Sequence, residues 1–140
     1  IALISTEIGT ELHEELQKGD LEKARIEIID AMIRMLDLDA LIAREHGEGL
    51  NLKLPETDIS AAAQAPTEEE LLSLHVILSE AVQTWRAAAQ PVIALAPVLQ
   101  EAFSLCAQLV AKLGGDVVKD ITAKVDYNAT RPWRHGQRRC

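Results

Sequence analysis

The sequence predicts an all-α protein, a helical bundle of four to five helices. Three observations favour this fold class. Apolar residues recur at helical spacing in several long segments, and the five prolines and seven glycines fall mostly outside those segments. Hydrophobic residues make up 48% of the chain but aromatic residues only 3%, so aliphatic side chains must fill the core. A chain of 140 residues is long enough for one domain with a sizeable core.

The first two helices are expected over residues 1–17 and from Asp20 to about residue 45. Lys18-Gly19-Asp20 separates them, because glycine commonly ends a helix and Asp20 can cap the next one. Ile1 already lies within a helical pattern, so we expect that a further segment precedes it. From residue 47 to residue 66 the sequence has no helical period, which predicts an exposed loop.

Three further helices follow that loop. Thr67 with Glu70 resembles a capping box, and the apolar face behind it extends to Trp85. Pro91 either begins or kinks the next segment. A fourth helix is expected over residues 98–113 and ends at a glycine pair, after which Asp116 caps a last helix through about residue 128. The tail from residue 129 lacks periodicity.

Two clusters of acidic residues lie on the first two helices. Residues three or four apart share a helix face, so Glu7, Glu11 and Glu14 form one stripe, and Glu27 and Asp30 form another. The neighbouring residues are mostly apolar, and a buried carboxylate is costly unless it is paired or bound to a cation. Carboxylates that converge from two helices suit a hard divalent cation such as Mg2+. The alternative is that both stripes are solvated helix faces.

Composition excludes several classes of function. A net charge of −8 argues against a general nucleic-acid binder. Cys106 and Cys140 are too few for a disulfide framework or a closed zinc site, and we expect Cys106 to be a core residue. The apolar stretch 91–113 contains polar residues and favours a buried helix over a membrane span. No secretory signal is evident, so we expect a cytoplasmic protein.

The C-terminal region combines basic, amide and aromatic side chains. Lys124 and Asn128 share a helix face, Tyr127 and Trp133 flank them, and Arg131 follows. Lysine and arginine offset phosphate charge, asparagine can bind a base edge or a sugar, and an aromatic ring can stack on a base. The alternative is a solubilising basic tail. Elsewhere His75 is expected to be an ordinary helix histidine.

Together these motifs resemble the MazG-like family of all-α nucleoside triphosphate pyrophosphohydrolases. The family pattern is ExxE, a spacer, ExxD and a later Lys-x-x-x-Asn. The segments Glu11-Leu12-His13-Glu14 and Glu27-Ile28-Ile29-Asp30 match the two acidic halves. The run from Lys124 to Gly136 is similar to the ending of one subgroup, with its Asn-x-x-Arg-Pro-x-x-His-Gly motif.

Two departures from the family pattern concern the first motif and the middle of the chain. In the subgroup, Glu7 aligns with the first acid, which places Thr10 where the second Glu belongs. Either Glu11 supplies the missing carboxylate one position later, or the pair is Glu11 and Glu14. The stretch of about residues 45–110 has no counterpart and is interpreted as an insertion, supplying an extra helical pair or an oligomer interface.

The resemblance implies Mg2+-dependent hydrolysis, with Mn2+ as an alternative, of a nucleoside or deoxynucleoside triphosphate to the monophosphate and pyrophosphate. In this resemblance the metal ligands are Glu7, Glu11, Glu27 and Asp30, and the general base is Glu11 or Glu14. The residues that bind the phosphates or the sugar are Lys124, Asn128 and Arg131. Trp133 stacks on the base. The resemblance also implies a homodimer or homotetramer that completes the bundle, with neither nucleic acid nor membrane as partner.

Two other functions fit the same residues. A non-catalytic helical interaction module that retained the fold and lost the metal site is favoured by Thr10 and by the insertion. A phosphohydrolase with another substrate, such as a nucleoside diphosphate or a phosphoribosyl compound, would differ in its products.

Overall fold

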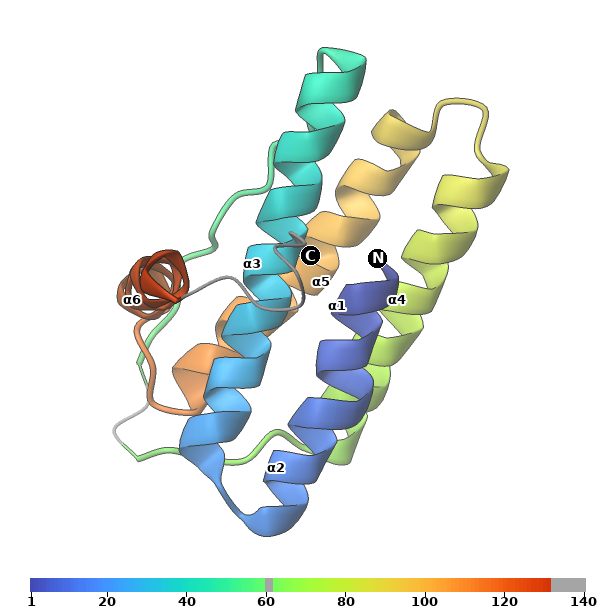
Figure 1. Ribbon diagram of the computed structural model, residues 1–140. Helices are drawn as coiled ribbons and strands as arrows, with labels where there is room; N and C mark the ends of the chain where they lie inside the picture. Colours follow the sequence, from blue (N-terminus) through green and yellow to red (C-terminus); the bar gives the residue numbers. More distant parts are fainter. Residues whose placement is uncertain (60–61, 132–140) are drawn as a thin grey trace.

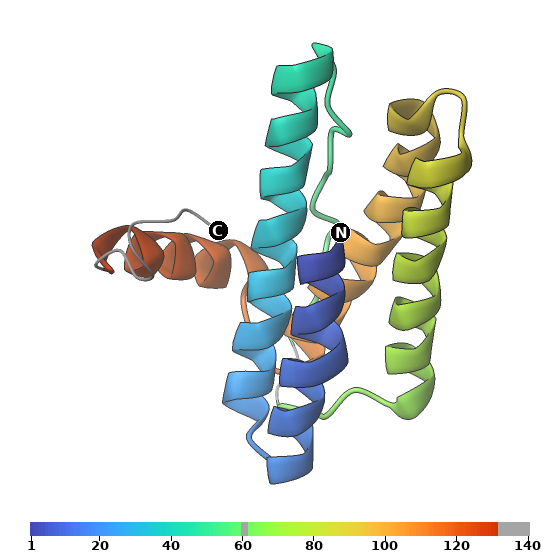
Figure 2. The same ribbon diagram turned by 45° about the vertical axis from the view of Figure 1, so that its right-hand side comes forward.

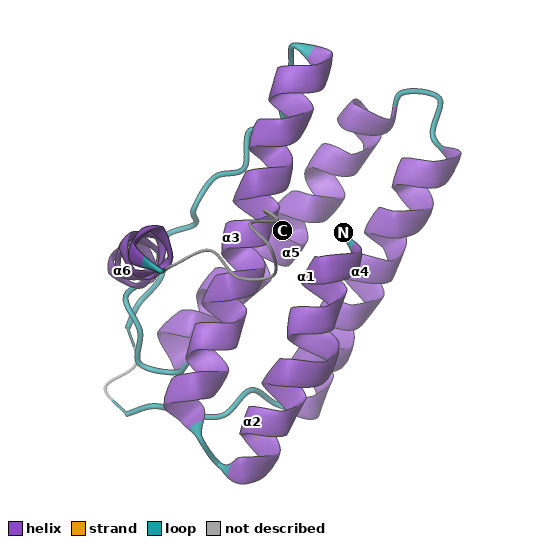
Figure 3. Cartoon of the chain, in the orientation of Figure 1, coloured by secondary structure: helices purple, strands orange, loops and turns teal. Residues whose placement is uncertain are grey.

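The computed structural model describes residues 1–59 and 62–131, except the side chains of Ala2 and Leu3. Regular structure in these residues is entirely helical, which confirms the predicted all-α bundle (Figure 1, Figure 3). The helices are α1 (Ala2–Thr6), η1 (Glu7–Glu11), α2 (Leu12–Lys18), α3 (Leu21–His46), α4 (Glu68–Ala87), α5 (Pro91–Lys112) and α6 (Val117–Thr130). Because η1 is a π-helix continuous with its neighbours, α1, η1 and α2 form one N-terminal arm.

Two helical hairpins build the bundle. The N-terminal arm and α3 form the first, and their turn uses Gly19, whose φ of 74° suits glycine, and Asp20, whose side chain accepts a hydrogen bond from the Lys23 backbone N–H. Helices α4 and α5 form the second hairpin, and α5 packs on α3. Helix α6 contacts α3 and projects sideways from the bundle (Figure 2).

A single hydrophobic cluster joins all of these helices. It includes Ile8 and Leu12 of the arm, Ile28 of α3, and many residues of α4 and α5. The largest fully buried side chains are Phe103, Ile4, Ile8, Leu12, Ile28, Ile29, Met32, Met35, Leu74, Leu78, Leu95 and Leu99. The stretch 45–110 therefore supplies a helical pair, and that pair contributes a large part of the core.

The helix boundaries agree with the sequence prediction except in α5 and η1. The Thr67–Glu70 capping box forms as expected, with hydrogen bonds in both directions. Helix α5, however, begins at Pro91 rather than at residue 98. Proline is favoured in the first turn of a helix because its missing N–H needs no partner there. Of the two alternatives for Pro91, it begins the helix, which then continues through Pro97.

Helix α5 is the one helix of the described chain that is long and apolar enough to cross a membrane. Several of its side chains, including Leu95, Leu99 and Phe103, are nevertheless buried against the other helices. Cys106 is also fully buried, as predicted, and burial raises the pKa of its thiol to about 12. This pattern is that of a core helix.

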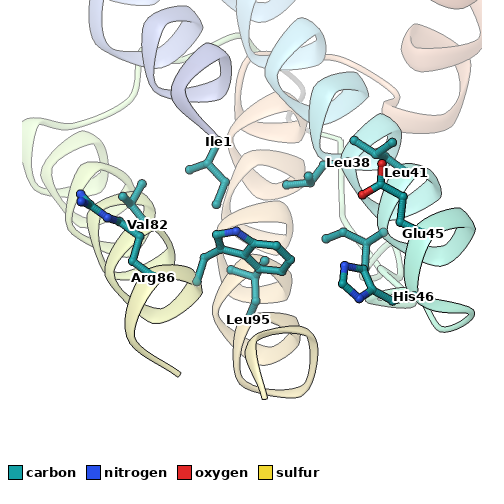
Figure 4. A pocket seen from close by; sticks show the side chains of 10 residues that line it. Ile1, Leu38, Leu41, Glu45, His46, Val82, Arg86 and Leu95 are labelled. Atoms are coloured by element: carbon teal, nitrogen blue, oxygen red, sulfur yellow. The ribbon is translucent and has the colours of Figure 1, made fainter. Parts of the chain in front are cut away.

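An apolar hollow of 350 Å³ lies at the end of the bundle where α3 and α4 extend past Ile1 (Figure 4). The Trp85 indole meets the His46 ring edge-on there, with centroids 6.2 Å apart. Its lining residues are Ile1, Leu38, Leu41, Ile42, Glu45, His46, Val82, Trp85, Arg86 and Leu95. None of the residues that the sequence singled out for chemistry lies in this hollow.

The long loop after α3 is fixed to the bundle at its start. The Asp39 carboxylate accepts hydrogen bonds from the backbone N–H groups of Leu50, Asn51 and Leu52, at 2.5, 3.3 and 3.0 Å. Asn51 has a φ of 56°, a left-handed conformation that asparagine tolerates and that turns successive N–H groups toward one anion. The Gln100 side chain of α5 also bonds both backbone groups of Lys53.

We predict that Asp39→Ala lowers the free energy of unfolding by about 1–3 kcal/mol, because it leaves three loop N–H groups without their acceptor. Denaturant unfolding followed by circular dichroism measures this change. Asp37→Ala on the exposed side of the same helix is the control and should change stability by less than about 0.5 kcal/mol. Equal losses in the two variants would contradict the anchoring role of Asp39.

Candidate metal centre

Three carboxylates converge where the N-terminal arm faces α3. One oxygen from each of Glu7, Glu11 and Glu27 lies within 4.8 Å of the others. Glu7 is buried with 8% of its surface exposed, Glu27 is half-buried, and Glu11 is exposed. Members of the two predicted acidic stripes thus meet in a cluster that we call the acid cluster, and Asp30, the second residue of the stripe on α3, is not among its three residues. Glu14 lies exposed on α2, outside the acid cluster.

A π-helical turn links Glu7 and Glu11 of the acid cluster. A π-helical turn contains one more residue than an α-helical turn, and the Leu12 N–H accordingly bonds the Glu7 carbonyl, five residues back. The wider turn rotates Glu11 back toward the side that Thr10 would occupy in an α-helix. Of the two alternatives left open by the sequence, the geometry therefore favours Glu7 with Glu11. Such π-turns are frequent at functional sites.

Glu27 is the residue of the acid cluster whose pKa is raised most. Its pKa is raised from an ordinary 4.5 to about 7, first by burial, then by a shared hydrogen bond with Glu11, and then by the negative charges of Glu11, Asp30 and Glu7. Its Oε2 atom is buried and has no hydrogen-bond partner in the structure. A buried acceptor without a donor is costly, so Glu27 is poised to gain from a cation or a proton.

Arg34 partly compensates Glu7. Its Nε donates to Glu7 Oε1 at 3.1 Å, yet the pKa of Glu7 is still raised, because burial outweighs the arginine. In the described part of the chain, no lysine or arginine pairs with Glu11 or Glu27. The donor set consists of carboxylate oxygens, which a hard divalent cation prefers. These residues therefore fit Mg2+ or Mn2+ chemically, although nothing in the donor set selects between the two.

Asp30 and Lys124, predicted as metal ligand and phosphate ligand, contact each other. Lys124 Nζ of α6 lies 3.0 Å from Asp30 Oδ2 of α3, and both side chains are largely covered. Asn128 and Arg131 are exposed near the end of α6, with the Arg131 guanidinium 5.6 Å from the centre of the Tyr127 ring. Trp133 lies outside the described residues. The predicted substrate-binding end of the chain thus adjoins the acidic face of α3 through one ion pair.

Two contacts were missed by sequence reasoning. The first is the ion pair between Arg34 and Glu7. Arg34 follows Asp30 by four residues and Glu27 by seven, so helical spacing already placed it on the acidic face of α3. The second is between His13 of α2 and His75 of α4, whose Nε2 atoms are 3.3 Å apart. Burial, and then the charge of His13, lower the pKa of His75. No sequence signal paired these histidines, because they come from different hairpins.

Comparison with protein-family models, curated proteins and solved structures finds no match to this chain. The resemblance to MazG-like enzymes therefore rests on the sequence motifs alone and stays a prediction.

We predict that Glu27→Gln stabilises the metal-free protein increasingly as pH rises. The folded-state pKa of Glu27 is raised to about 7, so the unfolded chain loses this proton more readily, and ionisation penalises folding progressively from pH 4.5 upward until about pH 7. In EDTA at pH 7.5 the gain should be about 1–2 kcal/mol, allowing for partial exposure of the site. Urea unfolding at several pH values measures the difference between variant and wild type.

Glu22→Gln, on an exposed position of the same helix, is the matched control and should show a stability difference that varies little with pH. If the stability difference between Glu27→Gln and wild type also varied little with pH, the raised pKa assigned to Glu27 would be contradicted.

Proposed function

We propose that this chain hydrolyses a nucleoside or deoxynucleoside triphosphate to the monophosphate and pyrophosphate in a reaction that requires Mg2+, or Mn2+ in its place. The observation that carries the proposal is the convergence of Glu7, Glu11 and Glu27, with Glu27 Oε2 buried and unpartnered. The ordered MazG-like motifs give the reaction class. The adjacent Lys124 supplies the positive charge that a triphosphate needs.

Each acidic residue has a role in this proposal. Glu7, Glu11 and Glu27 would hold the cation, and Asp30 is the fourth candidate ligand on the same helix as Glu27. A bound divalent cation supplies charge neutralisation of the phosphates and a lowered pKa of coordinated water. Glu11 is the better placed of the two candidate general bases, because it is exposed and lies in the acid cluster, whereas Glu14 lies outside it.

The basic end of the chain would bind the substrate. Lys124 would contact the phosphates, and Asn128 and Arg131 would contact phosphates or sugar from the exposed end of α6. Trp133 retains its proposed stacking role from the sequence motif alone. A cytoplasmic location, where nucleoside triphosphates are available, is part of the same proposal.

We also propose that the bundle assembles as a homodimer or homotetramer. Leu72 and Val76 lie four residues apart on one face of α4 and are 64% and 57% exposed. On α5, Ile93 is 63% exposed. Exposed apolar residues at helical spacing are typical of helix–helix interfaces between subunits.

One observation favours the alternative of a non-catalytic interaction module. Arg34 and Lys124 already pair with Glu7 and Asp30, so two of the four candidate metal ligands are neutralised by the chain itself. A module that had lost its metal could be stabilised in this way. The alternative differs from the enzyme in one measurable property, since it would have no affinity for the cation.

We predict Mg2+-dependent release of pyrophosphate from at least one member of a panel of canonical and deoxynucleoside triphosphates. EDTA should abolish the release. Glu27→Gln should reduce kcat/KM by about 100-fold or more, because even a group that only orients a metal ligand typically contributes 10- to 100-fold. Asp30→Ala should also reduce it, and Glu22→Gln should retain activity.

The products and a thermal melt separate the candidate functions. Orthophosphate without pyrophosphate would indicate a different phosphohydrolase. No release from any triphosphate, together with an unchanged melting temperature on adding Mg2+, would refute the enzyme and favour the non-catalytic module, since a ligand that binds the folded state raises its stability.

A further inference from the structure

A second cavity lies between α3 and α6, apart from the acid cluster. Its volume is 420 Å³, within the range of roughly 300–1,000 Å³ that is usual for small-molecule sites. Its lining residues are Arg25, Ile26 and Ile29 of α3 and Asp120, Ala123, Lys124 and Tyr127 of α6. We call it the α3–α6 cavity. It exists because α6 crosses beside α3 instead of joining the bundle (Figure 2).

The walls of the α3–α6 cavity are apolar in the middle and charged at the borders. Ile26, Ile29 and Ala123 supply the apolar surface, and the partly exposed Tyr127 adds an aromatic ring. Arg25 Nε pairs with Asp120 at 3.3 Å, and Arg25 carries further N–H donors on its guanidinium group. An apolar slot with hydrogen-bonding groups at its border suits a flat heterocycle better than an aliphatic chain, which would cover the ion pairs without satisfying them.

Lys124 connects this cavity to the acidic face of α3. It lines the cavity, its Nζ lies 3.0 Å from Asp30 Oδ2, and it also lies 5.9 Å from the centre of the Tyr127 ring. Arg131 approaches the same ring. Two cations therefore lie near the Tyr127 ring, and one of them, Lys124, also pairs with Asp30. A ligand with phosphates at Lys124 would have its uncharged part within reach of Ile26, Ile29 and Tyr127.

We propose that the α3–α6 cavity receives the base and sugar of the nucleoside triphosphate, with Tyr127 and Ile26 against the base. This inference rests on the proposed function and extends it, because it makes residues outside the motifs determine how tightly nucleotides bind. Tyr127 takes the stacking role in the described part of the chain. Arg25 offers donors to acceptor atoms on the edge of the base, a pairing for which arginine is well suited.

A cavity-filling substitution tests the proposal. Ala123→Leu places a larger apolar side chain in the cavity and leaves all the charged residues unchanged. We expect it to raise the Kd of the preferred nucleoside triphosphate about 10-fold, comparable to losing one base–aromatic contact. The Kd of inorganic tripolyphosphate, which has no base, should change less than about 2-fold. Calorimetric titrations with Mg2+ present measure both constants.

Ala129→Leu makes the same change at an exposed position of α6 that does not line the cavity, and it should leave both constants unchanged. Tyr127→Ala should weaken nucleotide binding alone, and Tyr127→Phe, which keeps the ring, should restore it. An α-helical circular dichroism spectrum identical to wild type establishes that each variant is folded.

The outcomes separate this inference from the proposed function. Triphosphate hydrolysis with unchanged nucleotide affinity in Ala123→Leu and Tyr127→Ala would overturn the cavity assignment and leave the enzyme intact. Nucleotide binding that depends on the cavity without any hydrolysis would support the assignment and overturn the enzyme. Equal weakening of tripolyphosphate and nucleotide would also overturn the assignment, because the effect would then lie on the phosphates.

Discussion

The packing of the N-terminal arm against α3 is the constraint on which the candidate chemistry depends. Burial of Ile8 and Leu12 on one side and of Ile28 and Ile29 on the other fixes how the two helices face each other. Glu7, Glu11 and Glu27 are brought together by that register, and their repulsion opposes the apolar contacts that impose it. The structure relieves the repulsion in two ways. Arg34 pairs with Glu7, and the raised pKa of Glu27 allows it to keep a proton near neutrality.

Helix α3 is central to the fold because a different element packs on each of its sides. It packs on the arm, on α5 and on α6. Glu27 meets the acids of the arm, Asp30 reaches Lys124 of α6, and Ile26 and Ile29 contribute to the α3–α6 cavity. Near its C-terminal end, Asp39 fixes the following loop. One long helix therefore carries two of the four candidate metal ligands, Glu27 and Asp30, and one wall of the cavity.

Much of the fold could be predicted from the sequence because its signals are local. Asp20, Thr67 and Asp116 all cap helices as expected, and helical periodicity located each long segment. The errors came from tertiary packing. The expected helix start at residue 98 was too late, because Leu95 is part of the core and α5 runs from Pro91 through Pro97. Helical spacing singled out Glu7, Glu11 and Glu27, but it also included Glu14 and Asp30, which are not in the acid cluster, and it gave no sign of the π-turn. The pairing of Asp30 with Lys124 and the α3–α6 cavity depend on the position of α6, which no local pattern specifies.

The Asp30–Lys124 ion pair is compatible with catalysis as well as with a vestigial site. A partly covered carboxylate and ammonium need opposite charges nearby, and each supplies the other in the structure described here. If a divalent cation took the carboxylate and a phosphate took the ammonium, each group would exchange one counter-charge for another. Neither would then be left unpaired, so the cost of opening the pair would be largely offset. The same pairing in a protein without affinity for cations would be permanent. Cation affinity therefore depends first on Glu11 and Glu27, the two candidate metal ligands that no lysine or arginine of the described chain neutralises.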